Sequence, residues 1–222
     1  IENKITGKTK AILINTPNNP TGKVYSEEDL KKLSQMLIHK QIETGSPLYL
    51  INDEPYRKVV YEGLKIPKLF QLYKNLFSVT SHSKDLGIPG QRIGYIYFHP
   101  EIDDPKMAEG LSIANRILGF VNAPAIFQRA VEELQNISVD IKGYQYKRDL
   151  IYNSLRSFGY EVIKPEGTFY IFPKAPIKDD IRFTDKLQEK LVLVVPGSGF
   201  GRKGYFRIAF CTEDIVIERA LN

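Results

Sequence analysis

Four short apolar runs, each followed by polar residues, recur through the first hundred residues of this chain. They occupy residues 11–15, 48–53, 76–80 and 93–98. Between the first two runs, apolar residues recur at helical spacing, and Ser26 stands three residues before Asp29 in a variant of the helix-capping box. Buried parallel strands are typically continuous apolar runs, and the helices between them cover both faces of the sheet. The sequence therefore predicts an α/β fold that contains part of a mostly parallel sheet with covering helices.

The second half of the chain shows a different order of elements. Two helical stretches, at about 123–137 and 143–158, are followed by three short apolar runs at 168–172, 191–195 and 205–210. A closing helix follows, for which Thr212 is the expected N-cap residue. We therefore expect two domains, a larger one over residues 1–140 and a smaller C-terminal α+β domain over residues 141–222.

Polar side chains follow three of the predicted strands. Asn19 lies just past the first, Asp53 ends the second, and residues 81–84 follow the third. Ligands of open α/β sheets bind at the carboxyl ends of the strands. We therefore expect these residues, which are far apart in the sequence, to meet at one edge of the sheet.

Charge and composition limit the kinds of partner. The net charge is +5, but the basic residues are scattered, so nucleic-acid binding is not expected. The single cysteine, Cys211, excludes an internal disulfide and favours a reducing compartment, so we expect a cytoplasmic protein. No apolar run approaches the roughly 20 residues that span a bilayer, and no signal peptide is recognisable, so we expect no membrane partner. The chain starts at Ile1 and leads almost directly into a strand, which favours a piece of a longer protein.

Residues 81–92 carry the strongest chemical signal. They place two hydroxyls, a lysine and an arginine in a turn that contains Gly and Pro. Cationic and hydroxyl groups bind phosphate, and a lysine amine that is kept neutral by burial or by a nearby cation can attack a carbonyl. The segment therefore fits a site that binds a phosphate and forms a covalent imine through Lys84. The alternative for Lys84 is a solvated surface lysine.

This segment resembles the cofactor-lysine motif of the class I/II aminotransferases, the fold type I enzymes that use pyridoxal phosphate. Residues 18–22, 53–56, 165–170 and 204–210 are similar to four further motifs of this family, in the family's order. The resemblance covers essentially the whole chain as the C-terminal portion of such an enzyme. It implies that residues 1–140 are the C-terminal part of the pyridoxal-phosphate-binding large domain. It also implies a homodimer in the full-length protein and a site without a metal.

The resemblance assigns three residues to the ring of pyridoxal phosphate. Asn19 and Tyr56 would bond the ring hydroxyl, and Asp53 would keep the pyridine nitrogen protonated so that the ring accepts electrons. Glu54 is the competing carboxylate, but neighbours on a strand point to opposite faces. The alternatives are an ordinary Asn-Pro turn at Asn19 and a polar strand end at Asp53.

The resemblance also assigns the lysine and the phosphate ligands. Lys84 would form the imine and would move the proton between the substrate Cα and the cofactor C4′. Ser81, three residues before the lysine, and Arg92, eight residues after it, match the family's phosphate ligands. Ser83 adds a hydroxyl or orients the loop.

Arg207 is the candidate for binding the substrate. An arginine on an apolar strand is costly to bury without an anion, and its planar guanidinium suits a carboxylate. It matches the family's arginine for the substrate carboxylate, and Asn19 would also contact the substrate. Arg202 and Lys203, in a Gly-rich loop nearby, are the alternatives.

The leading functional hypothesis is a pyridoxal-phosphate-dependent aminotransferase, most similar to the aspartate-type enzymes, that transfers an amino group from an amino acid to a 2-oxo acid. One alternative is a carbon–sulfur β-lyase that uses the same cofactor, and another is a non-catalytic binding domain on the same scaffold. Because the resemblance places part of the cofactor site before Ile1, we expect an open sheet edge, weakened cofactor affinity and little or no turnover by this chain alone.

Overall fold

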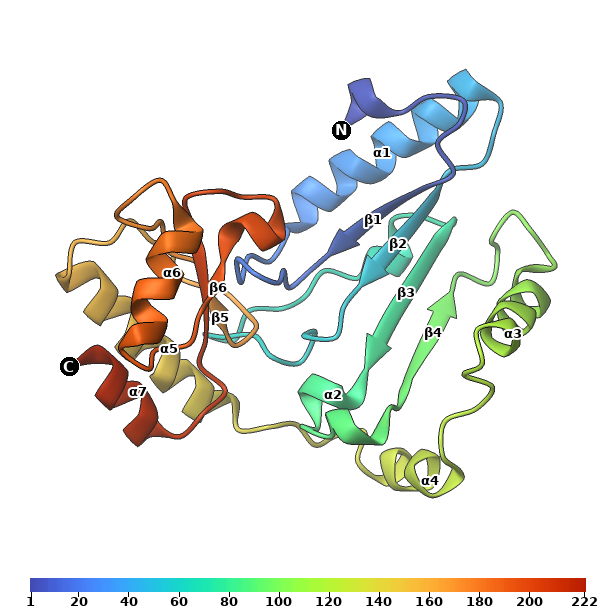
Figure 1. Cartoon of the computed structure of the whole chain (residues 1–222). Coiled ribbons are helices and arrows are strands. Elements are labelled where there is room, and N and C mark those ends of the chain that lie inside the picture. Colours follow the sequence, from blue (N-terminus) through green and yellow to red (C-terminus); the bar gives the residue numbers. More distant parts are fainter. The chain divides into compact units, whose positions relative to one another are not determined.

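The computed structural model describes residues 1–222, which form two compact units (Figure 1). The first unit contains Ile1–Thr16, Tyr25–Lys58 and Lys65–Val139. The second contains Pro17–Val24, Val59–Leu64 and Asp140–Asn222. Two short segments from the first third of the chain therefore belong to the same unit as the C-terminal third.

The first unit is built on a four-stranded sheet. Its strands are β1 (Ala11–Asn15), β2 (Tyr49–Asp53), β3 (Leu76–Ser81) and β4 (Gly94–Phe98), in the order β1-β2-β3-β4. The first three are parallel, and β4 is antiparallel to β3. The four apolar runs of the sequence are thus confirmed as strands of a mostly parallel sheet.

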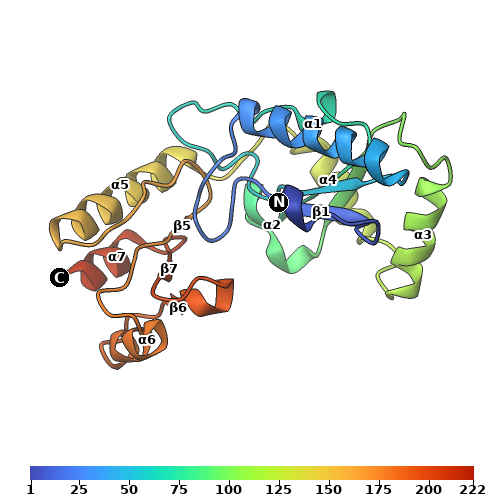
Figure 2. The ribbon, with the colours of Figure 1, turned by 90° about the horizontal axis from the view of Figure 1, so that it is seen from above.

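Helix α1 (Glu27–Thr44) covers one face of this sheet (Figure 2). The Ser26 hydroxyl accepts a hydrogen bond from the Asp29 amide at 3.1 Å, as the capping box predicts, and the helix ends at Gly45 in the left-handed region. The apolar side of the helix packs on the strands, and together they form one core of buried residues. This core comprises Ile14, Leu30, Leu37, Leu48, Leu50, Leu69, Tyr73 and Leu76.

The sequence predicted helices on both faces of the sheet, but the opposite face is largely uncovered. Leu13 on β1 is 65% exposed and Ile96 on β4 is 49% exposed. Helices α3 (Met107–Ile117) and α4 (Ala125–Glu133) follow β4, but α3 buries none of its residues and α4 only Val131. The chain's own helices therefore cover the sheet on one face and leave apolar side chains accessible on the other.

The second unit contains a small antiparallel sheet in the order β5-β7-β6. Its strands are β5 (Tyr170–Ile171), β6 (Val195–Pro196) and β7 (Phe206–Ala209), and its helices are α5 (Ile141–Ser157), α6 (Asp180–Glu189) and α7 (Asp214–Leu221). Phe183 of α6 packs on Phe206 of β7 beside Ala175 to form its core. The strands are shorter than predicted, and α6 was not predicted.

The N-cap of the closing helix is a correction. Glu213, not Thr212, is the N-cap residue of α7, and its side chain makes no capping hydrogen bond. The Thr212 carbonyl instead accepts a hydrogen bond from the Lys147 amine on α5. None of the helices combines the length and the apolar character that crossing a bilayer requires.

Candidate active site

The ends of β1 and β2 place a carboxylate and an amide side by side. The strand register pairs Asn15 with Asp53, and the Asn15 Nδ2 donates to the Asp53 Oδ2 at 3.0 Å and to the Asp53 carbonyl at 2.9 Å. Asp53 is half-buried, and this burial raises the pKa of its carboxyl above the ordinary value. A protonated ring nitrogen next to this carboxylate would offset that cost, so Asp53 fits the role of a pyridinium partner.

Asn15 was not among the predicted site residues. It ends the first apolar run, so its position was visible in the sequence, but its contact with Asp53 depends on the pairing of two strands 38 residues apart. The neighbouring Glu54 has different partners: its carboxylate accepts from Asn52 at 2.9 Å and from Tyr97 at 2.5 Å. Burial raises the pKa of Glu54, although these hydrogen bonds and Arg57 oppose the shift.

Lys84 lies on a four-residue helix, α2 (His82–Asp85), that follows β3 directly. Its Nζ is 5.8 Å from the ring centroid of Tyr56, a residue that is only 3% exposed. Tyr56 comes three residues after Asp53 in the turn that leaves β2. The structure therefore brings Lys84 to the segment that carries Asp53 and Tyr56.

The expected phosphate ligands lie at the same end of the sheet. Ser81 ends β3 and is paired with Gly94, two residues after Arg92. A Cβ on Gly94 would meet the Thr80 carbonyl oxygen at 2.5 Å, so only glycine allows the strands to approach this closely. Arg92 is exposed and adopts a left-handed conformation at φ 51°, and its guanidinium donates to the Pro89 carbonyl at 2.9 Å.

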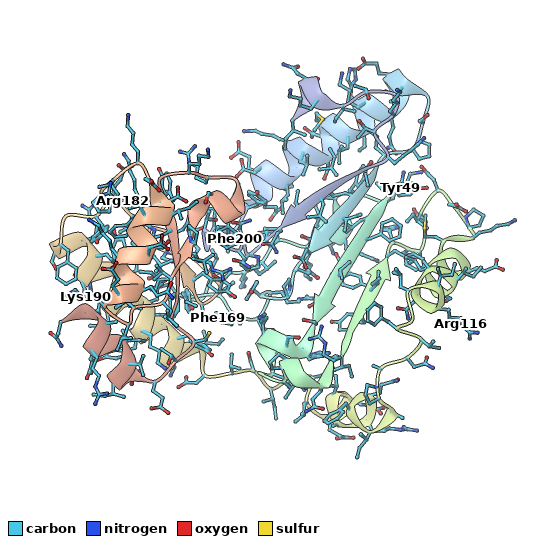
Figure 3. All side chains as sticks on the ribbon, in the orientation of Figure 1. Tyr49, Arg116, Phe169, Arg182, Lys190 and Phe200 are labelled. Carbon is cyan, nitrogen blue, oxygen red and sulfur yellow. The ribbon has the colours of Figure 1, made fainter.

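Two other arginines do not belong to this group. Arg116 on α3 is exposed (Figure 3), and the Arg129 side chain on α4 is 86% exposed, in an ion pair with Glu132. The structure thus leaves both on the surface.

Arg207 lies on β7 in the second unit and is enclosed by aromatic rings. Its Cζ is 4.3 Å from the ring centroid of Tyr170 and 4.7 Å from that of Phe200, which Figure 3 labels. Its Nη1 donates to the Asn19 Oδ1 at 2.9 Å, and its Nε is buried without a hydrogen-bond partner. A buried guanidinium N–H without an acceptor fits a site that receives an anionic group.

The loop that holds Asn19 packs against the 165–170 segment within the second unit. The amides of Glu166 and Gly167 both donate to the Gly22 carbonyl at 2.9 Å. A Cβ on Gly22 would meet the Pro165 Cβ at 2.5 Å, so glycine is required for this approach. The peptide bond between Asn19 and Pro20 is cis.

The predicted residues thus form two groups, one in each unit. Asp53, Tyr56, Ser81, Ser83, Lys84 and Arg92 belong to the first unit, and Asn19 and Arg207 to the second. That Asn19 joins the first group at one edge of the sheet stays a prediction.

Comparison with known proteins identifies the family. The family model described as "Aminotransferase class I and II" matches residues 1–222, so the chain belongs to this family. An aminotransferase structure from Eubacterium rectale is 42% identical with a TM-score of 0.95, and the match covers 99% of this chain and 56% of that one. The aspartate aminotransferase structure from Thermotoga maritima is 30% identical with a TM-score of 0.83, over 99% and 56% of the two chains.

Sequence relatives agree with this assignment. The probable aspartate/prephenate aminotransferase of Aquifex aeolicus is 32% identical, and the match covers 98% of this chain and 57% of that protein. The chain therefore spans somewhat more than half the length of its relatives. The α/β fold with a mixed sheet matches that of the aspartate aminotransferase structures.

Proposed function

We propose that this chain carries part of the active site of an aminotransferase that uses pyridoxal phosphate to transfer an amino group from an amino acid to a 2-oxo acid. The observation that carries the proposal is the grouping of Lys84, Tyr56 and Asp53 in the first unit, with Lys84 Nζ 5.8 Å from the Tyr56 ring. Membership of the family supports it.

Four kinds of group in this chain would hold the cofactor. Lys84 would attach its aldehyde carbon covalently, Asp53 would face its pyridine nitrogen, and Tyr56 and Asn19 its ring hydroxyl. The phosphate would be bound by the side chains of Ser81, Ser83 and Arg92. When bound, pyridoxal phosphate supplies an acceptor for the electrons that remain when the substrate Cα loses a proton.

The chain's own residues would then bind the substrate and move that proton. The Arg207 guanidinium binds the α-carboxylate, with its buried Nε as an additional donor, and Asn19 fixes the orientation of the guanidinium. Once the amino group of the substrate has displaced it from the cofactor, the freed Lys84 amine near the Tyr56 ring would take the proton from Cα and give it to the C4′ carbon of the cofactor. The rings of Tyr170 and Phe200 shield the guanidinium from water and so strengthen its attraction for a carboxylate.

Finer features of the protein are part of the same proposal. The names of the relatives support an aspartate-type substrate. We propose a homodimer in the cytoplasm, and the free Cys211 fits a reducing compartment. The large domain would end near residue 140, and residues 141–222 would form the small domain.

The test is an amino-transfer assay on the protein produced from its complete coding sequence. With pyridoxal phosphate, aspartate and a 2-oxo acid, we expect the wild type to form the new amino acid and Lys84→Ala to lose at least about 1,000-fold in kcat, because the covalent and proton-transfer roles are both removed. Lys74→Ala, at a surface lysine paired with Asp103, is the matched control. Equal activity in Lys84→Ala and the wild type would refute the proposal. Pyruvate and ammonia formed from cystathionine without a 2-oxo acid would instead show a β-lyase.

A further inference from the structure

The short helix that carries Lys84 has a buried side with two titratable residues. His82 and Asp85 are three positions apart on α2 and therefore lie on one side of the helix, and they are only 4% and 5% exposed. Lys84 is two positions after His82, at about 200° around the helix, and is partly exposed. The contacts on the buried side therefore fix the rotation of the helix, and with it the position from which the Lys84 side chain extends.

His82 and Asp85 contact each other on that side, and the partly exposed Lys58 reaches Asp85 from the segment after β2. We call these three residues the anchor cluster. The His82 Nδ1 lies 3.2 Å from the Asp85 Oδ2, and the Lys58 Nζ lies 3.6 Å from the same oxygen. The second oxygen of Asp85 accepts from the Leu86 amide at 2.8 Å. An ionised carboxylate only accepts hydrogen bonds, so the His82 Nδ1 is the donor in this pair.

The anchor cluster also fixes the segment 135–139, within the same unit. The Asp85 carbonyl accepts from the Val139 amide at 2.7 Å and from the Ser138 hydroxyl at 3.2 Å. Lys58 donates to the carbonyls of Gln135 at 2.7 Å and Ile137 at 3.3 Å. The helix is therefore held both through side chains and through the backbone.

Lys58 connects the helix to the other cofactor residues. It lies two positions after Tyr56 and five after Asp53 on the segment that leaves β2. The contact between Lys58 and Asp85 thus joins the segment of the ring ligands to the helix of the lysine. Removing one member takes a partner away from the largely buried Asp85 carboxylate, so the geometry depends on all three side chains.

We propose that His82, Asp85 and Lys58 are positioning residues that fix the rotation of α2 and so hold the Lys84 amine where it reacts with the cofactor aldehyde. This inference rests on the proposed function of Lys84. The three side chains act through Lys84 and need not touch the cofactor or the substrate.

The test uses the protein from its complete coding sequence and measures how fast added pyridoxal phosphate becomes attached to Lys84, by the visible absorbance of the lysine-bound cofactor. In His82→Leu, which keeps the bulk but removes the donor, we expect attachment and kcat each to slow by about tenfold, with KM changed by less than about twofold. His82→Asn places an amide donor near the position of Nδ1 and should recover most of the rate. His39→Leu, at an exposed histidine on α1, is the matched control and should behave as the wild type.

Lys58→Met provides a second test if His82→Leu does not fold, and we expect a smaller loss of about threefold in the attachment rate. A lower melting temperature with wild-type attachment rate and kcat in these variants would show a purely structural group and overturn the inference. If wild-type protein attaches no cofactor at Lys84, the proposed function fails and this inference fails with it. A wild type that attaches the cofactor, with variants that attach it equally fast, overturns the inference alone.

Discussion

At the scale of single residues, Asp53 shows how the site is prepared for a cation. Its carboxyl is half-buried at the end of β2, and burial raises its pKa above the ordinary value. The folded protein therefore binds a proton at this group more readily than the unfolded chain does. The carboxylate thus costs stability above the unfolded pKa of about 4, and the cost increases as the pH rises through the folded pKa.

This cost predicts the effect of Asp53→Asn in the protein without cofactor. At neutral pH the variant should be more stable than the wild type, by less than about 1 kcal/mol because water screens the half-exposed group. The difference should disappear below about pH 4, where the carboxyl is protonated in both states. Thermal unfolding from below about pH 4 to neutral pH measures the difference in stability between the variant and the wild type. Asp185→Asn, at an exposed position of α6, is the control. Lower stability of the variant at neutral pH would contradict this explanation.

The strands were more predictable than the contacts between side chains. The four apolar runs became β1 to β4 because a buried strand needs only a continuous apolar segment. The contacts of Asn15 with Asp53 and of Lys58 with Asp85 depend on register and tertiary packing, which no local pattern specifies. For Lys84, the local motif was sufficient to place it after β3.

At the scale of elements, α6 holds the loop beside Arg207. Asp180, at the first position of the helix and 3% exposed, accepts from the amides of Ser198 at 2.7 Å and Gly204 at 3.1 Å. Burial opposes ionisation of this carboxyl, but the hydrogen bonds outweigh it and the pKa is lowered. The sequence indicated this Gly-rich loop but not its attachment to Asp180, because the hydrogen bonds join residues 18 and 24 positions apart.

Asp180→Ala should therefore destabilise the protein by about 2 kcal/mol or more, because two buried amides lose a charged acceptor. Because the pKa is lowered in the folded state, the stabilisation is present above about pH 4, the unfolded value, and is lost as the pH falls below it. Urea unfolding at neutral pH and at acid pH measures both effects, and Asp185→Ala on the same helix is the control. An equal loss of stability at both pH values would argue against the charged contact.

At the scale of the whole molecule, the chain covers 56–57% of the length of the relatives reported above and leaves part of its apolar surface accessible. Leu13 on the edge strand β1 is 65% exposed, and Ile117 and Phe120 at the end of α3 are 79% and 73% exposed. Edge strands and apolar patches of this kind are sites of association. Cofactor binding is therefore best tested in the protein from its complete coding sequence.

The most direct test of the central claim is to find which lysine carries the cofactor. The protein is incubated with pyridoxal phosphate, reduced with borohydride and digested, and the labelled peptide is identified by mass spectrometry. We expect the label on Lys84, with no comparable label on Lys58 or Lys74, and we expect it to disappear in Lys84→Ala. Label spread over surface lysines, or unchanged total label in Lys84→Ala, would contradict the assignment of Lys84 as the lysine that binds the cofactor.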